Sequence, residues 1–418
     1  MRQTRLKRGT EGMRLQALAL SAIGGVVSLA PSAAHAQAVP EIGTEREWTV
    51  GASGEVYYDT NTSRTEDDFA VVRGIKQEDY VFTPSLTASI MQPFGRQAVF
   101  LKGNVGYTFH RYNPNLDRRR INVTGGVGSI LGPCRPAAYA TYDANQSDLA
   151  DLDLGTTENL RETTTVAVAV ACAPSAGLGG SVLVQRADSK NSADSVKNSD
   201  ATIKTATVSM GYSQPSIGTV SLGFSHTDTE YPNRIIPGRP VGDGFFTQAY
   251  FLSYNRQFGS KLSVGANIGR IHLKREFAPP GSEQSLSSTS YGLDVVYGLG
   301  RRIDLELHAA RSVTPSKQVG KSYDQQTSAE GAIVYRLGTR VTLTGGYIWR
   351  DTESNTDTAS SLLVVNSSRV DTVYGTITFV PNDRMSFSLN VRHEEREANP
   401  TQFTYSGLRI GLSAQTAF

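Results

Sequence analysis

The chain has 418 residues, and its 41 basic and 39 acidic side chains give a formal net charge of only +2. That near balance offers no argument for nucleic acid as a partner. The mean hydropathy of −0.29 excludes a bundle of membrane-spanning helices. Such a bundle needs several runs of about 20 apolar residues, whereas this sequence has a single long apolar run, close to its N-terminus.

Residues 1–36 have the order of a secretory signal peptide. Basic side chains come first, an apolar stretch follows over 15–30, and Ala34 and Ala36 then provide a small-x-small cleavage pattern. The alternative is an uncleaved membrane anchor, which is disfavoured because the apolar stretch is short and contains Gln and Gly. We therefore predict export, with residues 37–418 forming one further domain.

From Trp48 onward, apolar and polar residues alternate in short segments, which is the period of a β-strand with two different faces. The clearest examples are 385–392 (MSFSLNVR) and 303–308 (IDLELH), and the pattern repeats over 220–225 and 99–105. Helical periodicity of useful length is not evident in this part of the sequence. The mature chain is therefore predicted to be all-β.

Two kinds of connection alternate between these segments. Eight are tight and carry turn residues, for example 92–95 and 381–383. The others are longer, polar and irregular, for example 61–77 and 351–367. Short turns on one side and long loops on the other are typical of barrels in the outer membrane of Gram-negative bacteria.

The number of turns sets the expected number of strands. Eight tight turns separate nine hairpins, so we predict a single transmembrane antiparallel up-and-down β-barrel of about 18 strands, with about 16 as the alternative. A soluble all-β repeat protein is disfavoured, because a long antiparallel sheet must hide its edges and closure into a barrel removes them.

The last predicted strand carries the pattern expected of an assembly signal. Counting back by twos from Phe418, the residues are mostly apolar and include Leu412, Ile410 and Leu408. A terminal aromatic on an alternating strand is what the outer-membrane barrel assembly machinery recognises. That machinery and the outer-membrane lipid are therefore expected partners.

The two cysteines are candidates for a disulfide. Cys134 lies in the second tight turn, and Cys172 lies at the end of the strand before the third. Neighbouring turns share one end of a barrel, and an exported protein meets an oxidising compartment. The alternative is two unpaired thiols that are too far apart to bridge.

The candidate functional residues are polar side chains on the inward faces of the predicted strands. They are Lys102, Asn104, Asp294, Asp304, Glu306, His308, Glu330, Arg336, Arg392 and Arg409. Both charge signs occur, so a single-sign ring of the kind that makes an ion-selective pore is not evident. Hydroxyl and amide groups nearby suit sugars, and they suit the plain hydration of a pore equally well.

Catalytic, cofactor and metal motifs do not stand out. The five His residues of the mature chain lie on different predicted strands without the close spacing of metal ligands. A Gly-x-Ser-x-Gly elbow and a phosphate loop are both missing from the sequence. We therefore predict that the protein is not an enzyme and needs no cofactor.

The first predicted strand carries a resemblance to a known family. It is a Gly-rich segment from Gly51 that ends in Tyr-Asp-Thr-Asn (58–61), with Arg64 nearby. This opening resembles that of a family of β-barrel porins from Proteobacteria, although residues 62–63 are Thr-Ser where that family has an apolar pair. Members of that family often accompany exopolysaccharide assembly systems.

The resemblance implies a conduit for exopolysaccharide export that works with a periplasmic polysaccharide-export protein, and this is our leading prediction. The alternative is a general diffusion porin for small polar solutes. A further alternative is a structural or adhesive barrel whose function lies in its extracellular loops.

Overall fold

The computed structural model describes residues 43, 45–147, 158–234, 242–277, 284–316, 321–356 and 365–418. The predicted signal peptide 1–36, with its cleavage pattern at Ala34 and Ala36, lies outside these residues.

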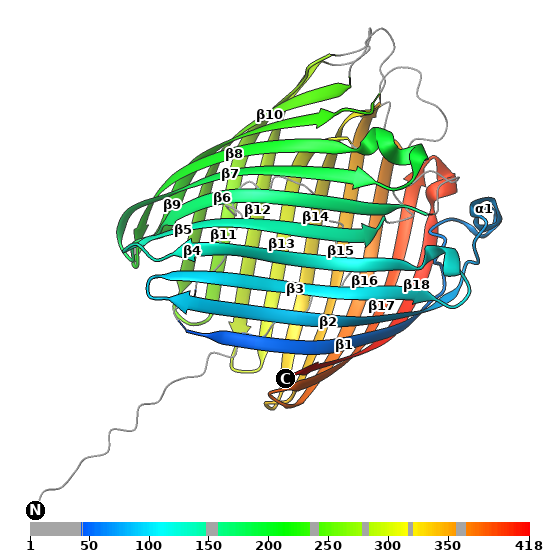
Figure 1. The fold of residues 1–418 in the computed structure, drawn as a ribbon, viewed down its shortest axis with the longest axis horizontal. Coiled ribbons are helices and arrows are strands. Elements are labelled where there is room, and N and C mark those ends of the chain that lie inside the picture. Colours follow the sequence, from blue (N-terminus) through cyan, green and yellow to red (C-terminus); the bar gives the residue numbers. More distant parts are fainter. Residues whose placement is uncertain are drawn as a thin grey trace, which may run out of the picture.

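The described chain forms one antiparallel sheet of 18 strands that closes on itself (Figure 1). Each strand pairs with its neighbours in sequence, and β1 also pairs with β18, so the predicted barrel of 18 strands is confirmed. The strands are β1 (Glu47–Asp59), β2 (Asp79–Phe94), β3 (Gln97–His110), β4 (Arg118–Ser129), β5 (Cys134–Gln146), β6 (Leu160–Cys172), β7 (Gly177–Asn191), β8 (Ala201–Gln214), β9 (Gly218–Tyr231), β10 (Asp243–Phe258), β11 (Leu262–Arg275), β12 (Ser285–Leu299), β13 (Ile303–Pro315), β14 (Lys321–Leu337), β15 (Val341–Thr356), β16 (Ser367–Asn382), β17 (Met385–Asn399) and β18 (Tyr405–Ala417).

The connections alternate between short and long, as the sequence predicts. The β2–β3 and β10–β11 turns contain Gly95 and Gly259 with φ of 65° and 60°, a left-handed conformation that glycine adopts at little cost. The longer connections carry short helices: α1 (Asp67–Arg73), η1 (Pro114–Leu116), η3 (Asp194–Ser199) and η4 (Thr401–Phe403). Among the described residues, none of the helices is long and apolar enough to cross a membrane.

Two long connections differ from the sequence expectation. The segment 61–77 was expected to be irregular, and it contains the single short helix α1. β15 also runs through Thr356, well into the segment 351–367 that was expected to be a loop. The ladder of backbone hydrogen bonds continues there because the part of a strand that extends beyond the membrane can carry polar residues on both faces.

Alternation along each strand gives the barrel two different walls. On β10, Tyr250 and Leu252 are 56% and 46% exposed, whereas their neighbours Ala249 and Phe251 are 3% and 6% exposed. The same period places exposed apolar residues outward around the ring, among them Leu86, Leu222 and Leu412. A closed barrel with an apolar outer wall leaves no unpaired strand edge and presents hydrocarbon to lipid tails.

The two ends of the chain meet where the barrel closes. The β1–β18 register runs from Gly51 opposite Ala417 to Asp59 opposite Arg409. The amide of Phe418 donates to the carbonyl of Val50 at 2.7 Å. Of the residues expected to form the assembly signal, Ile410 and Leu412 are 43% and 63% exposed on the outer wall.

Cys134 and Cys172 form a disulfide that joins the tight-turn ends of β5 and β6. Cys134 is the first residue of β5 and pairs directly with Cys172 in the ladder. The bond therefore ties together two neighbouring strands at the end of the barrel where the turns are short.

Candidate functional site

The inner wall of the barrel carries the polar side chains. The structure places Lys102 and Asn104 on the opposite face of β3 from Val99, Leu101 and Val105, which are all exposed on the outer wall. The same alternation puts the other predicted residues inside, and these are Asp294, Asp304, Glu306, His308, Glu330, Arg336, Arg392 and Arg409. All ten predicted residues therefore belong to the inner wall, and they are spread around it rather than gathered at one point.

One sector of this wall is built from hydroxyl groups. From β7 to β10, inward-facing Ser and Thr residues pair across neighbouring strands by side-chain hydrogen bonds. Ser181 bonds Ser209 at 2.7 Å, Thr207 bonds Ser225 at 2.9 Å, and Ser221 bonds Ser253 at 2.6 Å. Each hydroxyl retains further donor or acceptor capacity, so this sector offers a neutral surface to water and to polar solutes.

A second sector, on β12–β14, is mainly acidic. His308 Nδ1 lies 2.7 Å from Asp294 Oδ1, and the two residues are paired in the register of β12 and β13. Arg336 contacts the carboxylate of Asp304. Glu306 and Glu330 add two more carboxylates from the adjoining inward positions of β13 and β14.

The wall opposite this acidic sector carries both charge signs, since the inward Asn122 of β4 donates to Asp143 of β5 at 2.9 Å. Lys102 on β3 and Arg120 on β4 both lie on inward positions, because Asn104 pairs with Asn122 on the same face. β4 and β13 are nine strands apart in the ring of 18, so they lie across the barrel from each other. A solute in the lumen therefore meets charges of both signs on this wall as well.

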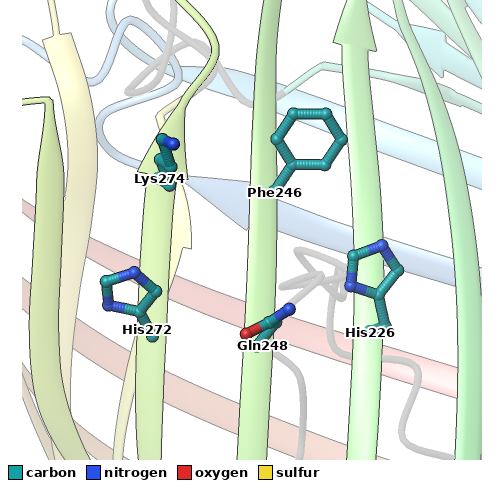
Figure 2. Close-up of a pocket in the computed structure, with 5 residues that line it drawn as sticks. All are labelled: His226, Phe246, Gln248, His272 and Lys274. Carbon is teal, nitrogen blue, oxygen red and sulfur yellow. The ribbon is translucent and has the colours of Figure 1, made fainter.

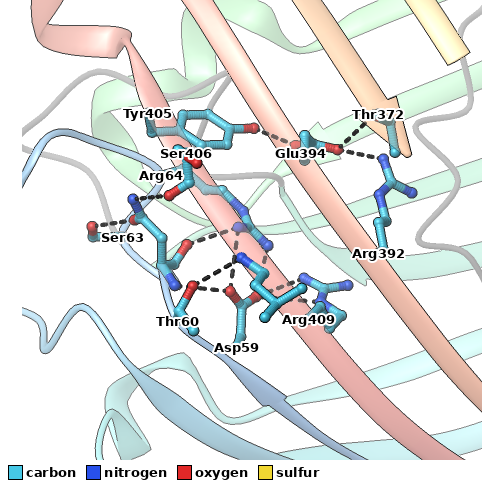
Figure 3. Close-up of polar contacts among 12 residues, drawn as sticks. Asp59, Thr60, Ser63, Arg64, Thr372, Arg392, Glu394, Tyr405, Ser406 and Arg409 are labelled. Atoms are coloured by element: carbon cyan, nitrogen blue, oxygen red, sulfur yellow. Dashed lines mark hydrogen bonds and ion pairs between the residues drawn. The ribbon is translucent and has the colours of Figure 1, made fainter. Parts of the chain in front are cut away.

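A network of ion pairs holds the barrel mouth at the point of closure (Figure 3). Asp59 at the end of β1 accepts from Arg409 of β18 at 2.9 Å and from Arg64 of the following loop at 2.7 Å. Asn61 donates to the carbonyls of Thr65 and Ser406, both at 3.0 Å. The sequence motif Tyr-Asp-Thr-Asn with its nearby Arg therefore folds the loop back onto the last strand.

The neighbouring strands extend this network along the inner wall. Glu394 of β17 accepts from Tyr405 of β18 and from Arg392. Sequence reasoning singled out Arg392 and Arg409 but missed Glu394, Asp59 and Arg64 as their partners. The motif itself could have indicated this pairing. It places Asp59 on an inward position at the end of β1, with Arg64 five residues later.

The mouth is partly covered on the side of β9–β13. Arg234, just after β9, is 1% exposed and donates to Asp243 at 3.4 Å and to the carbonyl of Ser316, just after β13, at 3.1 Å. Asp243 also pairs with Arg275 of β11 at 2.8 Å. The side chain of Arg234 therefore links the end of β9 to the end of β13, past the ends of β10, β11 and β12.

An apolar cluster lies beneath these ion pairs on the inner wall. Its buried members include Tyr231, Phe245, Ile271 and Leu273, with exposures of 3%, 0%, 1% and 2%. Apolar side chains on the inner wall of a pore would otherwise meet water, so their burial shows that they are covered from inside the barrel.

The described residues hold no candidate metal site. Within the part of the chain that the structure describes, no group of three or more His, Cys, Asp or Glu side chains is arranged to hold a metal ion. The Asp294–His308 pair is a pairwise contact on a half-exposed wall.

Comparison with known proteins supports the architecture. No protein-family model and no curated protein sequence matches this chain. Among solved structures, it is similar to OccK2 (OpdF) of Pseudomonas aeruginosa, with a TM-score of 0.50 and 11% identity over 90% of this chain and 98% of that one. It is also similar to the FrpB iron transporter of Neisseria meningitidis, with a TM-score of 0.50 and 8% identity over 85% of this chain and 63% of that one.

Identities this low show the fold alone. Together with the closed ring of 18 strands, the apolar outer wall and the polar inner wall, that fold defines a barrel of the porin type. The protein is a β-barrel of the outer membrane of a Gram-negative bacterium.

Proposed function

We propose that the barrel is a passive pore for small polar solutes. The observation that carries this proposal is the inner wall, on which hydroxyl groups of β7–β10 and ionised groups of β12–β14 and β3–β4 line the same closed ring. A ring of 16–18 strands is wide enough to leave an aqueous channel. Its polar lining replaces the water that a solute loses on entry.

Passage requires no chemistry in this mechanism. A sugar or another neutral solute exchanges hydrogen bonds with the hydroxyl sector, and its weak, repeated contacts allow it to leave as readily as it enters. Charges of both signs line the wall, so selectivity between anions and cations is weak. We infer that the contact between Arg234 and Ser316 at the mouth contributes to an upper limit on solute size.

Exopolysaccharide export remains a prediction that rests on the resemblance of the first strand. The contacts of the described residues favour the small-solute pore, because the hydroxyl pairs of β7–β10 supply a neutral polar lining. The structural or adhesive alternative likewise stays a prediction from the sequence. Deleting the gene and measuring the secreted polymer tests the export hypothesis. Unchanged secretion would refute that hypothesis.

The proposal is tested on the purified barrel in planar bilayers and liposomes. We expect ohmic single-channel currents and swelling of liposomes in small sugars, with swelling rates that fall as the sugar grows. A barrel that inserts and folds but passes neither ions nor small sugars would refute the proposal.

A matched pair of variants localises the pathway. Lys102 is exposed on the inner wall, and Lys190 of β7 is exposed on the outer wall. We expect Lys102→Glu to shift the reversal potential in a salt gradient toward cations, because it adds a carboxylate to the lumen. Lys190→Glu makes the same charge change outside the lumen and should leave the reversal potential unchanged.

A further inference from the structure

The hydrogen-bond ladder between β12 and β13 stops before either strand does. Its last pair at the long-loop end is Tyr291 with Arg311. β12 nevertheless stays paired with β11 as far as Ser285, and β13 stays paired with β14 as far as Pro315. The two strands therefore separate at the mouth, and within the described part of the chain residues 286–290 have no partner on β13.

The end of β13 lies inside the barrel rather than in its wall. Leu307 of β13 is 46% exposed on the outer wall, and alternation places Val313 on the same side of the strand. Val313 is nonetheless fully buried, in the apolar cluster that includes Ile271 of β11. That cluster belongs to the inner face of β11, because the outer face of the same strand carries His272 and Lys274 (Figure 2). Cα atoms of β13 also come within 8 Å of those of β11, although β12 separates the two strands in the ring.

The end of β14 accompanies β13. Gln325 has the alternation of Ile333, which is exposed on the outer wall, yet its side chain accepts a hydrogen bond at 3.3 Å from Ser288 on the inner face of β12. Tyr323 packs against the same apolar cluster as Val313. Side chains that would face outward in a regular barrel therefore contact the inner faces of β10–β12.

Two buried arginines hold this end of the β13–β14 hairpin in place. The described residues of the hairpin end, which we call the flap, are 312–316 and 321–326. Arg234 donates to the carbonyl of Ser316 at 3.1 Å, and Arg275 donates to the hydroxyl of Ser322 at 3.4 Å. Asp243 accepts from both arginines, so one carboxylate orients both contacts.

The strand edge that the flap leaves behind has a sequence suited to pairing with it. Continuing the β12–β13 register would place Ser290 opposite Ser312 and Ser288 opposite Thr314, all on inward positions. Such hydroxyl pairs already join neighbouring strands over β7–β10. Ser290 is 2% exposed, and its hydroxyl has no hydrogen-bond partner among the described residues. Because an unpaired strand edge and a buried hydroxyl without a partner are both costly, the continued ladder would relieve both costs.

We propose that the flap is a gate of the pore with two positions. In the first, it lies inside β10–β12 and takes up part of the lumen at the mouth. In the second, it returns to the wall, pairs with residues 286–290 and widens the mouth. The first position keeps Val313 buried and Ser316 bonded to Arg234, whereas the second completes the ladder, so each gains contacts that the other lacks. This inference rests on the proposed pore, since it states how the same lumen opens.

A cross-link that fixes the second position tests the gate. In Ser288→Cys/Thr314→Cys, oxidation should join the two strands across the continued ladder. We expect the single-channel conductance in planar bilayers to rise by about half or more, because the flap leaves the lumen. Failure of the thiols to cross-link, or equal conductance before and after cross-linking, would overturn the gate while leaving the pore standing. A barrel that passes no ions in either form would overturn both.

A matched control joins two strands that are already paired. Val182 and Val208 lie opposite each other on the outer wall of β7 and β8. Oxidation of Val182→Cys/Val208→Cys should leave the conductance unchanged. The control also accounts for reduction of the native disulfide between Cys134 and Cys172 when the reduced forms are compared.

Hydrogen exchange gives a readout that does not depend on passage through the pore. Cross-linking at Ser288 and Thr314 should slow exchange of the amides of 286–290 by about tenfold or more, because those amides enter a ladder. Unchanged exchange in the cross-linked barrel would contradict the second position.

Releasing the flap without altering β12 or β13 is the last arm. Arg234→Gln removes the donor to Ser316, and we expect the barrel to spend more time at the larger conductance level. Arg186→Gln removes an arginine that pairs with Asp188 on the outer wall, and it should not change this distribution. Equal behaviour of the two variants would overturn the role of Arg234 in holding the gate.

Discussion

The ion pairs beneath the barrel mouth allow a quantitative prediction about stability. The side chain of Asp243 is fully buried, and it accepts from Arg275 at 2.8 and 3.0 Å and from Arg234 at 3.4 Å. Arg234 and Arg275 are themselves 1% and 2% exposed. Asp243→Ala removes the carboxylate and leaves two guanidinium groups in a site that excludes water. Removing one partner of a buried ion pair costs about 3–5 kcal/mol, so we expect the free energy of unfolding to fall by about that amount.

Chemical unfolding in lipid vesicles measures this change. The two tryptophans of the chain, Trp48 and Trp349, report unfolding by fluorescence. Asp194→Ala is the matched control, because Asp194 and Lys197 form an ion pair on the exposed surface of η3. Exposed pairs contribute little, so the control should unfold at nearly the same denaturant concentration as the unaltered barrel. If Asp243→Ala behaves like the control, the buried carboxylate does not hold the mouth, and the reasoning is refuted.

Three other outcomes follow from the same structure. Lys102→Glu should make the pore more selective for cations, and an equal shift in Lys190→Glu would show that the effect does not arise in the lumen. Replacing Cys134 and Cys172 by Ser should lower the free energy of unfolding by about 2–4 kcal/mol, because the bond closes a loop between residues 38 apart in sequence; reducing agent should have the same effect on the unaltered barrel and none on the variant. Deleting Phe418 should reduce the amount of heat-modifiable, folded barrel in outer-membrane fractions, and unchanged assembly would remove its role as a signal.

The architecture was largely predictable because a barrel repeats one local rule. Alternation of apolar and polar residues identifies a strand, and it also assigns each residue to a wall. Lys102 and Asp294 could be assigned to the inner wall because each alternates with apolar neighbours that face outward. The eight tight turns then gave the number of strands, since they separate nine hairpins of two strands each.

The candidate site was less predictable because its contacts join residues that are distant in sequence. Asn61 bonds the carbonyl of Ser406 across a separation of 345 residues, and Asp59 reaches Arg409 only because β1 pairs with β18. Arg234 likewise meets Ser316 only after the intervening strands are in place. None of these three contacts has a local pattern that would have identified both partners.

The amino-acid sequence by itself determined which residues face lipid and which face the lumen, because that choice has a period of two and is made locally on every strand. Only the tertiary structure decided that Asp59 meets Arg409 where β1 pairs with β18, and that Arg234 reaches Ser316 at the mouth. These features depend on closure of the ring, since strand separation around the barrel, rather than separation along the chain, sets the distance between two side chains.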